Sequence, residues 1–154
     1  MNDEIWMQEA IREARAGIER NEGGPFGTVI VKDGKIVGRG HNGVLLKHDP
    51  TCHGEIEAIR DACKNLGTHI LKGCTLYTTS EPCPMCLGGI LWAKIDSIVC
   101  GCNVRDAEKI GFGDNSFYEI LTGKERGKLL RRTACREDCL QLFQDYSRKT
   151  DTRY

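Results

Sequence analysis

The stretch Tyr77-Thr-Thr-Ser-Glu-Pro-Cys-Pro-Met-Cys-Leu-Gly-Gly-Ile-Leu-Trp92 (YTTSEPCPMCLGGILW) joins a β-branched run to an apolar run that is typical of a helix. Its two cysteines, Cys83 and Cys86, follow Pro82, a residue type that suits the first turn of a helix. Residues three apart share one helix face, so both thiolates can bind the same ion. Taken alone, the pair is compatible with a redox dithiol, a structural or catalytic zinc site, or ordinary packing.

Outward from this stretch, helical and strand patterns alternate along the chain. They predict helices over residues 3–21, 49–65, 82–94 and 136–148, and strands over 28–32, 35–39, 74–79, 97–101 and 129–134. The first two strands form a hairpin around Asp33-Gly34, because Asp-Gly supplies the positive φ that a tight turn requires. We therefore predict an α/β fold of three α/β/α layers, with a central mixed, about five-stranded sheet. No repeat or linker interrupts the pattern, which predicts a single domain over 1–154.

Composition narrows the class of protein. The 154 residues are 40% hydrophobic and 29% charged, as in a globular domain, and no apolar run approaches the length of a membrane span. The 22 basic and 22 acidic residues balance, which disfavours a nucleic-acid binder and a membrane partner. Nine cysteines, an odd count without a secretion signal, indicate reduced thiols and a cytoplasmic protein.

A second short motif completes the chemistry of the cysteine pair. Thr51-Cys-His-Gly-Glu55 stands at the start of the preceding helix, so His53 and Glu55 are expected beside Cys83 and Cys86 at one edge of the sheet. One imidazole and two thiolates leave the fourth position of a tetrahedral zinc ion to water, as catalytic sites require. The ion lowers the pKa of that water, and the Glu55 carboxylate can carry its proton.

At these residues the chain resembles the zinc-dependent cytidine and nucleobase deaminases. Their signature, His-x-Glu followed by Pro-Cys-x-x-Cys, stands here as His53-Gly-Glu55 and Pro82-Cys83-Pro-Met-Cys86. The resemblance implies a cytidine-deaminase-like fold with one Zn²⁺ per subunit and a bound water or hydroxide. His53, Cys83 and Cys86 would be the ligands, and Glu55 the catalytic proton carrier. Gly54 departs from the alanine or valine that is usual there.

Within this family the chain is most similar to the bacterial guanine deaminases. The resemblance implies hydrolysis of guanine, a small-molecule purine base, to xanthine and ammonia. It assigns substrate contacts to Phe26 in Gly24-Pro-Phe-Gly27, to Asn42, and to Phe112 in Gly111-Phe-Gly-Asp114, and a catalytic role to Asp114. It also implies a homodimer that exchanges C-terminal segments, so that Tyr154 closes the partner's site.

Three other functions stay open. A tRNA adenosine deaminase would share the fold, the zinc site and the asparagine, and the basic run over residues 124–132 suits it. A deaminase of another amino-substituted heterocycle would share the chemistry. A non-catalytic zinc module would have no use for Glu55. The remaining thiols that attract notice are either a second four-thiol site or packed free cysteines: Cys100, Cys102, Cys135 and Cys139.

Overall fold

The computed structural model describes residues 3–124 and 132–152, and the chain divides into two compact units. The first unit, Met1–Tyr118, holds α1 (Asp3–Glu19), β1 (Gly27–Lys32), β2 (Lys35–His41), α2 (Val44–Lys47), α3 (Gly54–Leu66), β3 (Thr75–Ser80), α4 (Pro84–Trp92), β4 (Ser97–Cys102), α5 (Val104–Lys109) and the beginning of α6 (Asn115–Leu121). The second unit, Glu119–Tyr154, holds the end of α6 and all of α7 (Arg136–Lys149).

The first unit is built on a mixed sheet with the strand order β2-β1-β3-β4. β1 pairs antiparallel with both β2 and β3, and β3 pairs parallel with β4. The hairpin between β1 and β2 turns at Asp33 and Gly34, which both have positive φ as the Asp-Gly motif predicts. Because β1 is central, helices cover both of its faces, and its first five residues are buried.

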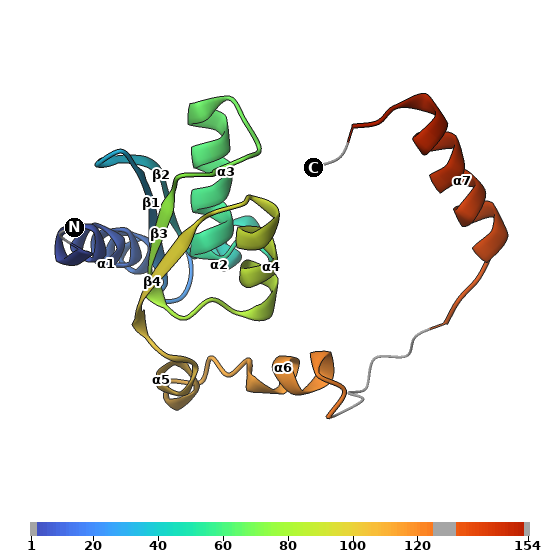
Figure 1. Ribbon diagram of the computed structural model, residues 1–154. Helices are drawn as coiled ribbons and strands as arrows, with labels where there is room; N and C mark the ends of the chain where they lie inside the picture. The colour runs from blue at the N-terminus through green and yellow to red at the C-terminus, as the bar shows by residue number, and fades with distance from the viewer. Residues whose placement is uncertain (1–2, 125–131, 153–154) are drawn as a thin grey trace. The chain divides into compact units, whose positions relative to one another are not determined.

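Helices cover the sheet on its two faces (Figure 1), which confirms the three-layer α/β/α prediction. On one face, α1 packs Ala10 against Val29, Val31 and Tyr77. On the other face, α3 and α4 cover a larger core of Ile30, Ala58, Ala62, Leu71, Cys74, Leu76, Ile90 and Ala93. Successive residues of β1 thus enter opposite cores, as the period of two in a strand requires.

Five details differ from the sequence prediction. The sheet has four strands among the described residues, not five: residues 129–131 of the expected last strand lie outside them, and residues 132–134 are irregular. Helix α3 begins at Gly54, later than expected, and the short α2 was not predicted. Pro84, not Pro82, is the proline of the first turn of α4. The strands before α3 and α4, β2 and β3, run parallel but are separated by β1.

The second unit is described by itself. Its helix α7 ends where Thr150 adopts an extended conformation, and the Tyr146 hydroxyl donates to the Thr152 carbonyl over 3.2 Å. Leu142, Phe143 and Tyr146 are exposed along this helix. Among the described residues of both units, no helix is both long and apolar enough to span a bilayer.

Candidate active site

Two helix N-termini bring the predicted metal ligands together. His53 is the N-cap residue of α3, and Cys83 is the N-cap residue of α4. Cys86 lies in the first turn of α4 and is fully buried, and its backbone N–H donates to the Cys83 sulfur over 3.4 Å. Both helices start at the same edge of the sheet because β2 and β3 run in the same direction. Glu55 and Cys86 lie in helix first turns as expected, whereas His53 and Cys83 precede the two helices as N-cap residues.

The spacing of the three ligand atoms fits a zinc ion. The His53 Nδ1 atom lies 3.6 Å from the Cys83 sulfur and 3.5 Å from the Cys86 sulfur. Around a tetrahedral zinc with Zn–N near 2.0 Å and Zn–S near 2.3 Å, such atoms stand about 3.6 Å apart. All three ligand atoms lie within 4.8 Å of one another, and no other group of metal-ligating side chains meets this criterion in the described residues.

The charges of the cluster also suit a cation. Hydrogen bonding from the Cys86 thiol, with help from His53, lowers the pKa of Cys83 to about 4, which favours the thiolate form of this sulfur. The same pairing with Cys83, together with burial, raises the pKa of Cys86. The Cys83 thiolate in turn raises the pKa of His53. A divalent cation at this point would stabilise both sulfurs as thiolates and the imidazole in its neutral form.

Glu55 is the buried carboxylate of the site. It lies in the first turn of α3, where the helix dipole favours a negative charge, and only 5% of its surface is exposed. Burial raises the pKa of its side chain, which the Cys86 thiol and the Thr78 hydroxyl partly offset by hydrogen bonding. The Thr78 Oγ1 atom donates to Glu55 Oε1 over 3.1 Å. A carboxyl group with a raised pKa next to a metal cluster is suited to accept and return a proton.

The residues expected to bind the base make contacts with one another and with the backbone around Asn42. The rings of Phe26 and Phe112 meet edge to face with their centroids 5.1 Å apart. Asn42 is buried, and its Oδ1 atom accepts from the backbone N–H groups of Gly24 and Val44 over 3.3 and 3.2 Å. Because the oxygen is held in this way, the Asn42 amide nitrogen is the end of the side chain that is left to donate to a ligand.

Asp114 and Tyr118 lie on the segment that follows α5. Asp114 is half-buried, and its pKa is raised by burial and by the negative charge of Cys83, while His53 acts in the opposite direction. The Tyr118 hydroxyl donates to the Pro82 carbonyl over 2.8 Å, which ties the start of α6 to the residue before Cys83. The structure thus brings Asp114 into the electrostatic environment of the metal ligands. Tyr154, the last predicted contact, lies outside the described residues.

Sequence reasoning missed two residues of the site, Thr28 and Thr78. They stand opposite each other on β1 and β3, and both are buried. In the sequence they are threonines inside β-branched strands, which is the ordinary composition of a strand. They differ from other strand threonines only in the register of β1 and β3, which places them opposite each other beneath Glu55.

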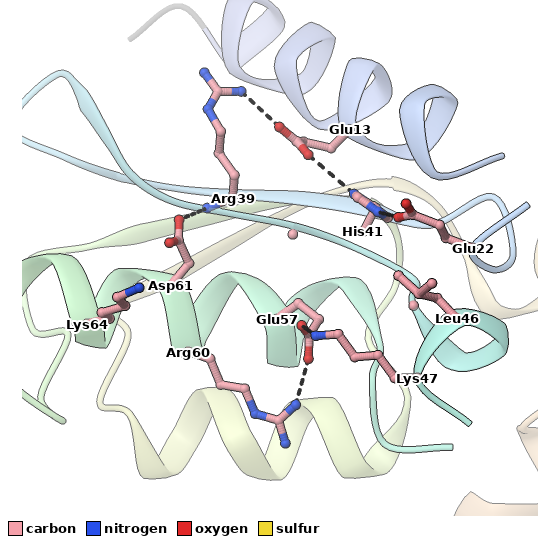
Figure 2. Close-up of a pocket in the computed structure, with 12 residues that line it drawn as sticks. Glu13, Glu22, Arg39, His41, Leu46, Lys47, Glu57, Arg60, Asp61 and Lys64 are labelled. Carbon is pink, nitrogen blue, oxygen red and sulfur yellow. Dashed lines mark hydrogen bonds and ion pairs between the residues drawn. The ribbon is translucent and has the colours of Figure 1, made fainter. Parts of the chain in front are cut away.

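A separate cavity of about 490 Å³ lies between α1, β2 and α3 and includes none of these residues (Figure 2). Several of its polar side chains contact one another: Arg39 pairs with Glu13, and the His41 ring lies against Glu13 and Glu22. Glu57 pairs with two cations, one from α2 and one from α3. Because none of the residues that line this cavity belongs to the metal-ligand cluster, it is a poorer candidate for catalysis than the His53 cluster.

Comparisons with known proteins agree with this geometry. The profile of the cytidine and deoxycytidylate deaminase zinc-binding region matches residues 1–102. Guanine deaminase from Bacillus subtilis (strain 168) is 47% identical over 121 residues, which cover 79% of this chain and 78% of that protein. A tRNA-specific adenosine deaminase from Aquifex aeolicus is 41% identical over 99 residues, which cover 64% of this chain and 65% of the relative.

Among solved structures, the X-ray structure of guanine deaminase from Bacillus subtilis superposes with a TM-score of 0.88 at 39% identity. The match covers 100% of this chain and 99% of that one. The family profile includes the whole of the metal-ligand cluster and Glu55, so sequence, fold and site agree. The chain belongs to the family of zinc-binding cytidine and deoxycytidylate deaminases.

Proposed function

We propose that this enzyme hydrolyses guanine to xanthine and ammonia. One observation carries the proposal: a carboxylate, Asp114, lies in the electrostatic environment of a zinc-type cluster that has its own buried acid, Glu55. With two carboxyl groups near one cation, one can accept a hydrogen bond from the substrate amino group while the other supplies a proton to it. The relatives called guanine deaminases, in sequence and in structure, support the same substrate.

His53, Cys83 and Cys86 would hold one Zn²⁺ per subunit, which when bound lowers the pKa of a water molecule in the fourth position. Glu55 takes one proton from that water and delivers it to the ring nitrogen next to C2 of guanine. A C2–O bond forms and the C2–N2 bond breaks. Glu55 then takes the second proton from the new hydroxyl on C2 as the C2=O bond of xanthine forms, and this proton, passed on by Glu55 or by Asp114, leaves with the amine as ammonia.

Recognition of the base follows from the polar and aromatic groups around the cluster. The ring of Phe26 offers an apolar face to the purine, while the Asn42 amide nitrogen donates to an acceptor on its edge. Asp114 accepts from the 2-amino group, which adenine lacks. This carboxylate therefore favours guanine over adenine.

We further propose that the whole chain forms one domain, that two chains form a homodimer with exchanged C-terminal segments, and that Tyr154 closes the partner's site. The exposed Leu142, Phe143 and Tyr146 of α7 support an interface for this helix, since such side chains gain from burial. All nine cysteines are free thiols, which supports a reducing cytoplasmic setting.

The decisive experiment is an ammonia-release screen of the zinc-loaded protein against guanine, adenine, cytosine, their nucleosides and a tRNA anticodon stem-loop. We expect release from guanine, with Glu55→Gln as the inactive control. Turnover of the stem-loop with none of free guanine would instead establish a tRNA adenosine deaminase, the alternative that the tRNA-specific relatives support. Release from another amino-purine alone would keep the chemistry and change the substrate.

A further inference from the structure

A chain of buried hydroxyl groups runs beneath the catalytic carboxylate. Thr28 on β1 and Thr78 on β3 are register partners, and 0% and 1% of their surfaces are exposed. Their Oγ1 atoms are 3.2 Å apart, and the Thr78 Oγ1 atom lies 3.1 Å from Glu55 Oε1. Both threonines face the α3 side of the sheet, since they alternate with residues that enter the opposite core.

The direction of these hydrogen bonds is set by chemistry. An ionised carboxylate can only accept, so the Thr78 hydroxyl must donate its single proton to Glu55. The Thr78 oxygen then has lone pairs free to accept, and Thr28 donates to it. Linked donors of this kind polarise one another, and they are strongest where water is excluded. Oε1 of Glu55 is therefore held by Thr78, and the Cys86 thiol also hydrogen-bonds to this carboxylate.

The space for this hydroxyl chain depends on Gly54. A Cβ atom at this position would stand 3.1 Å from Thr28 Oγ1 and 3.1 Å from the Phe26 carbonyl oxygen, closer than ordinary van der Waals contact. Because glycine has no Cβ atom, the start of α3 can pack closely against β1 with the Thr28 hydroxyl between them. Gly54 therefore makes room for the buried hydroxyl, which answers why the smallest residue stands next to two catalytic positions.

We propose that Thr28 and Thr78 are positioning residues for Glu55. Thr78 holds Oε1 as a fixed acceptor and so fixes the orientation of the carboxylate that takes the proton from water and returns it to the substrate. Thr28 strengthens and orients the Thr78 hydroxyl. The inference rests on the proposed deaminase function for its kinetic readout, but the hydrogen bonds themselves can be tested without a substrate.

The kinetic test uses substitutions that remove or keep the hydroxyl at nearly constant volume. In the zinc-loaded enzyme with guanine as substrate, Thr78→Val is expected to lower kcat by about 10- to 100-fold, the range for losing a hydrogen bond to a charged group, with KM unchanged. Thr78→Ser keeps the donor and should stay within roughly threefold of the parent. Thr28→Val should have a smaller effect than Thr78→Val, because the bond to Glu55 remains.

The matched control is Thr75→Val on the same strand, where the hydroxyl pairs with Ser97 over 2.8 Å and does not reach Glu55. It should leave kcat unchanged. In a Glu55→Gln background, Thr78→Val should cause no further loss of the residual rate. Equal losses in Thr78→Val and Thr78→Ser, or loss of bound zinc in Thr78→Val, would reduce both residues to a structural role and overturn the proposal.

A denaturation cycle separates this proposal from the choice of substrate. Thr78→Val should lower the denaturant midpoint of the zinc-loaded protein, but not in a Glu55→Ala background, where the hydroxyl would be buried without its acceptor. The same shift in both backgrounds would refute the hydrogen bond even in an active enzyme. If guanine is not turned over while this coupling is present, the proposed substrate fails and the positioning role stands.

Discussion

Replacing Gly23 with alanine is expected to weaken guanine turnover without touching any residue that contacts the metal. A Cβ atom at Gly23 would stand 2.1 Å from Asn42 Oδ1 and 2.3 Å from the Asn42 carbonyl oxygen, where ordinary contact begins at 3.4 Å. Asn42 must therefore move by about 1 Å, and a displacement of that size in a positioning residue costs about 100-fold in rate.

Asn42 is fixed in place by hydrogen bonds of both its side chain and its backbone. Its Oδ1 atom is held by the N–H groups of Gly24 and Val44, and its own N–H donates to the Phe26 carbonyl over 2.9 Å. A shift would break these bonds and turn the amide nitrogen away from the base. Because the metal-ligand cluster and Glu55 are not involved, we expect bound zinc to be unchanged, KM for guanine to rise, and kcat/KM to fall about 100-fold.

The matched control is Gly43→Ala, on the other side of Asn42. A Cβ atom there would meet its nearest neighbours at 3.8–3.9 Å, and the backbone φ of −115° suits any residue. Steady-state kinetics and zinc analysis of both variants make the comparison. A Gly23→Ala enzyme with the kcat/KM of the Gly43→Ala enzyme would refute the role given to Asn42.

Four shorter predictions concern other parts of the site. Glu55→Gln should retain zinc and lose about 10²- to 10⁴-fold in kcat by steady-state kinetics, the range for general acid–base catalysis; a near-normal rate would contradict the proton-carrier role. Cys83→Ser should lower both zinc content and Tm, and a chelator should lower the Tm of the parent but not of this variant. Tyr118→Phe removes the bond to the Pro82 carbonyl and should raise KM more than it lowers kcat. Deleting the C-terminal residues through Tyr154 should reduce activity and shift the light-scattering mass toward the monomer, and an unaffected rate would remove that segment from the site.

The metal cluster could be predicted from sequence because each of its halves is local. His53 and Cys83 are N-cap residues, and Cys86 is reached from Cys83 within one helical turn. The motif therefore encodes the geometry of each half in a few residues. The motif could not show how the sheet brings the two halves together. The strands that precede α3 and α4 are not neighbours, because β1 lies between them.

Two of the wrong predictions concern the proline at the start of α4 and the number of strands. Pro82 and Pro84 both suit a helix start, and the choice was made by Cys83, whose sulfur accepts the N–H of Cys86 and so caps the helix just before Pro84. Of the expected fifth strand, residues 132–134 have no partner strand among the described residues. Strand pairing is a tertiary event that a single run of residues does not determine.

Chemistry and substrate choice occupy parts of the molecule with different exposure, which explains why the first was easier to predict. Glu55, Cys86 and the two threonines are at most 5% exposed and belong to the packed layers around the sheet. In contrast, 48% of the surface of Phe112 is exposed, on a segment that follows the last strand. Buried groups are constrained by many neighbours, so a short motif implies their arrangement, whereas an exposed segment can change its residues without disturbing the core. The reaction class could therefore be predicted from the sheet and its two helix starts, whereas the prediction of guanine as substrate rests in part on exposed residues after β4.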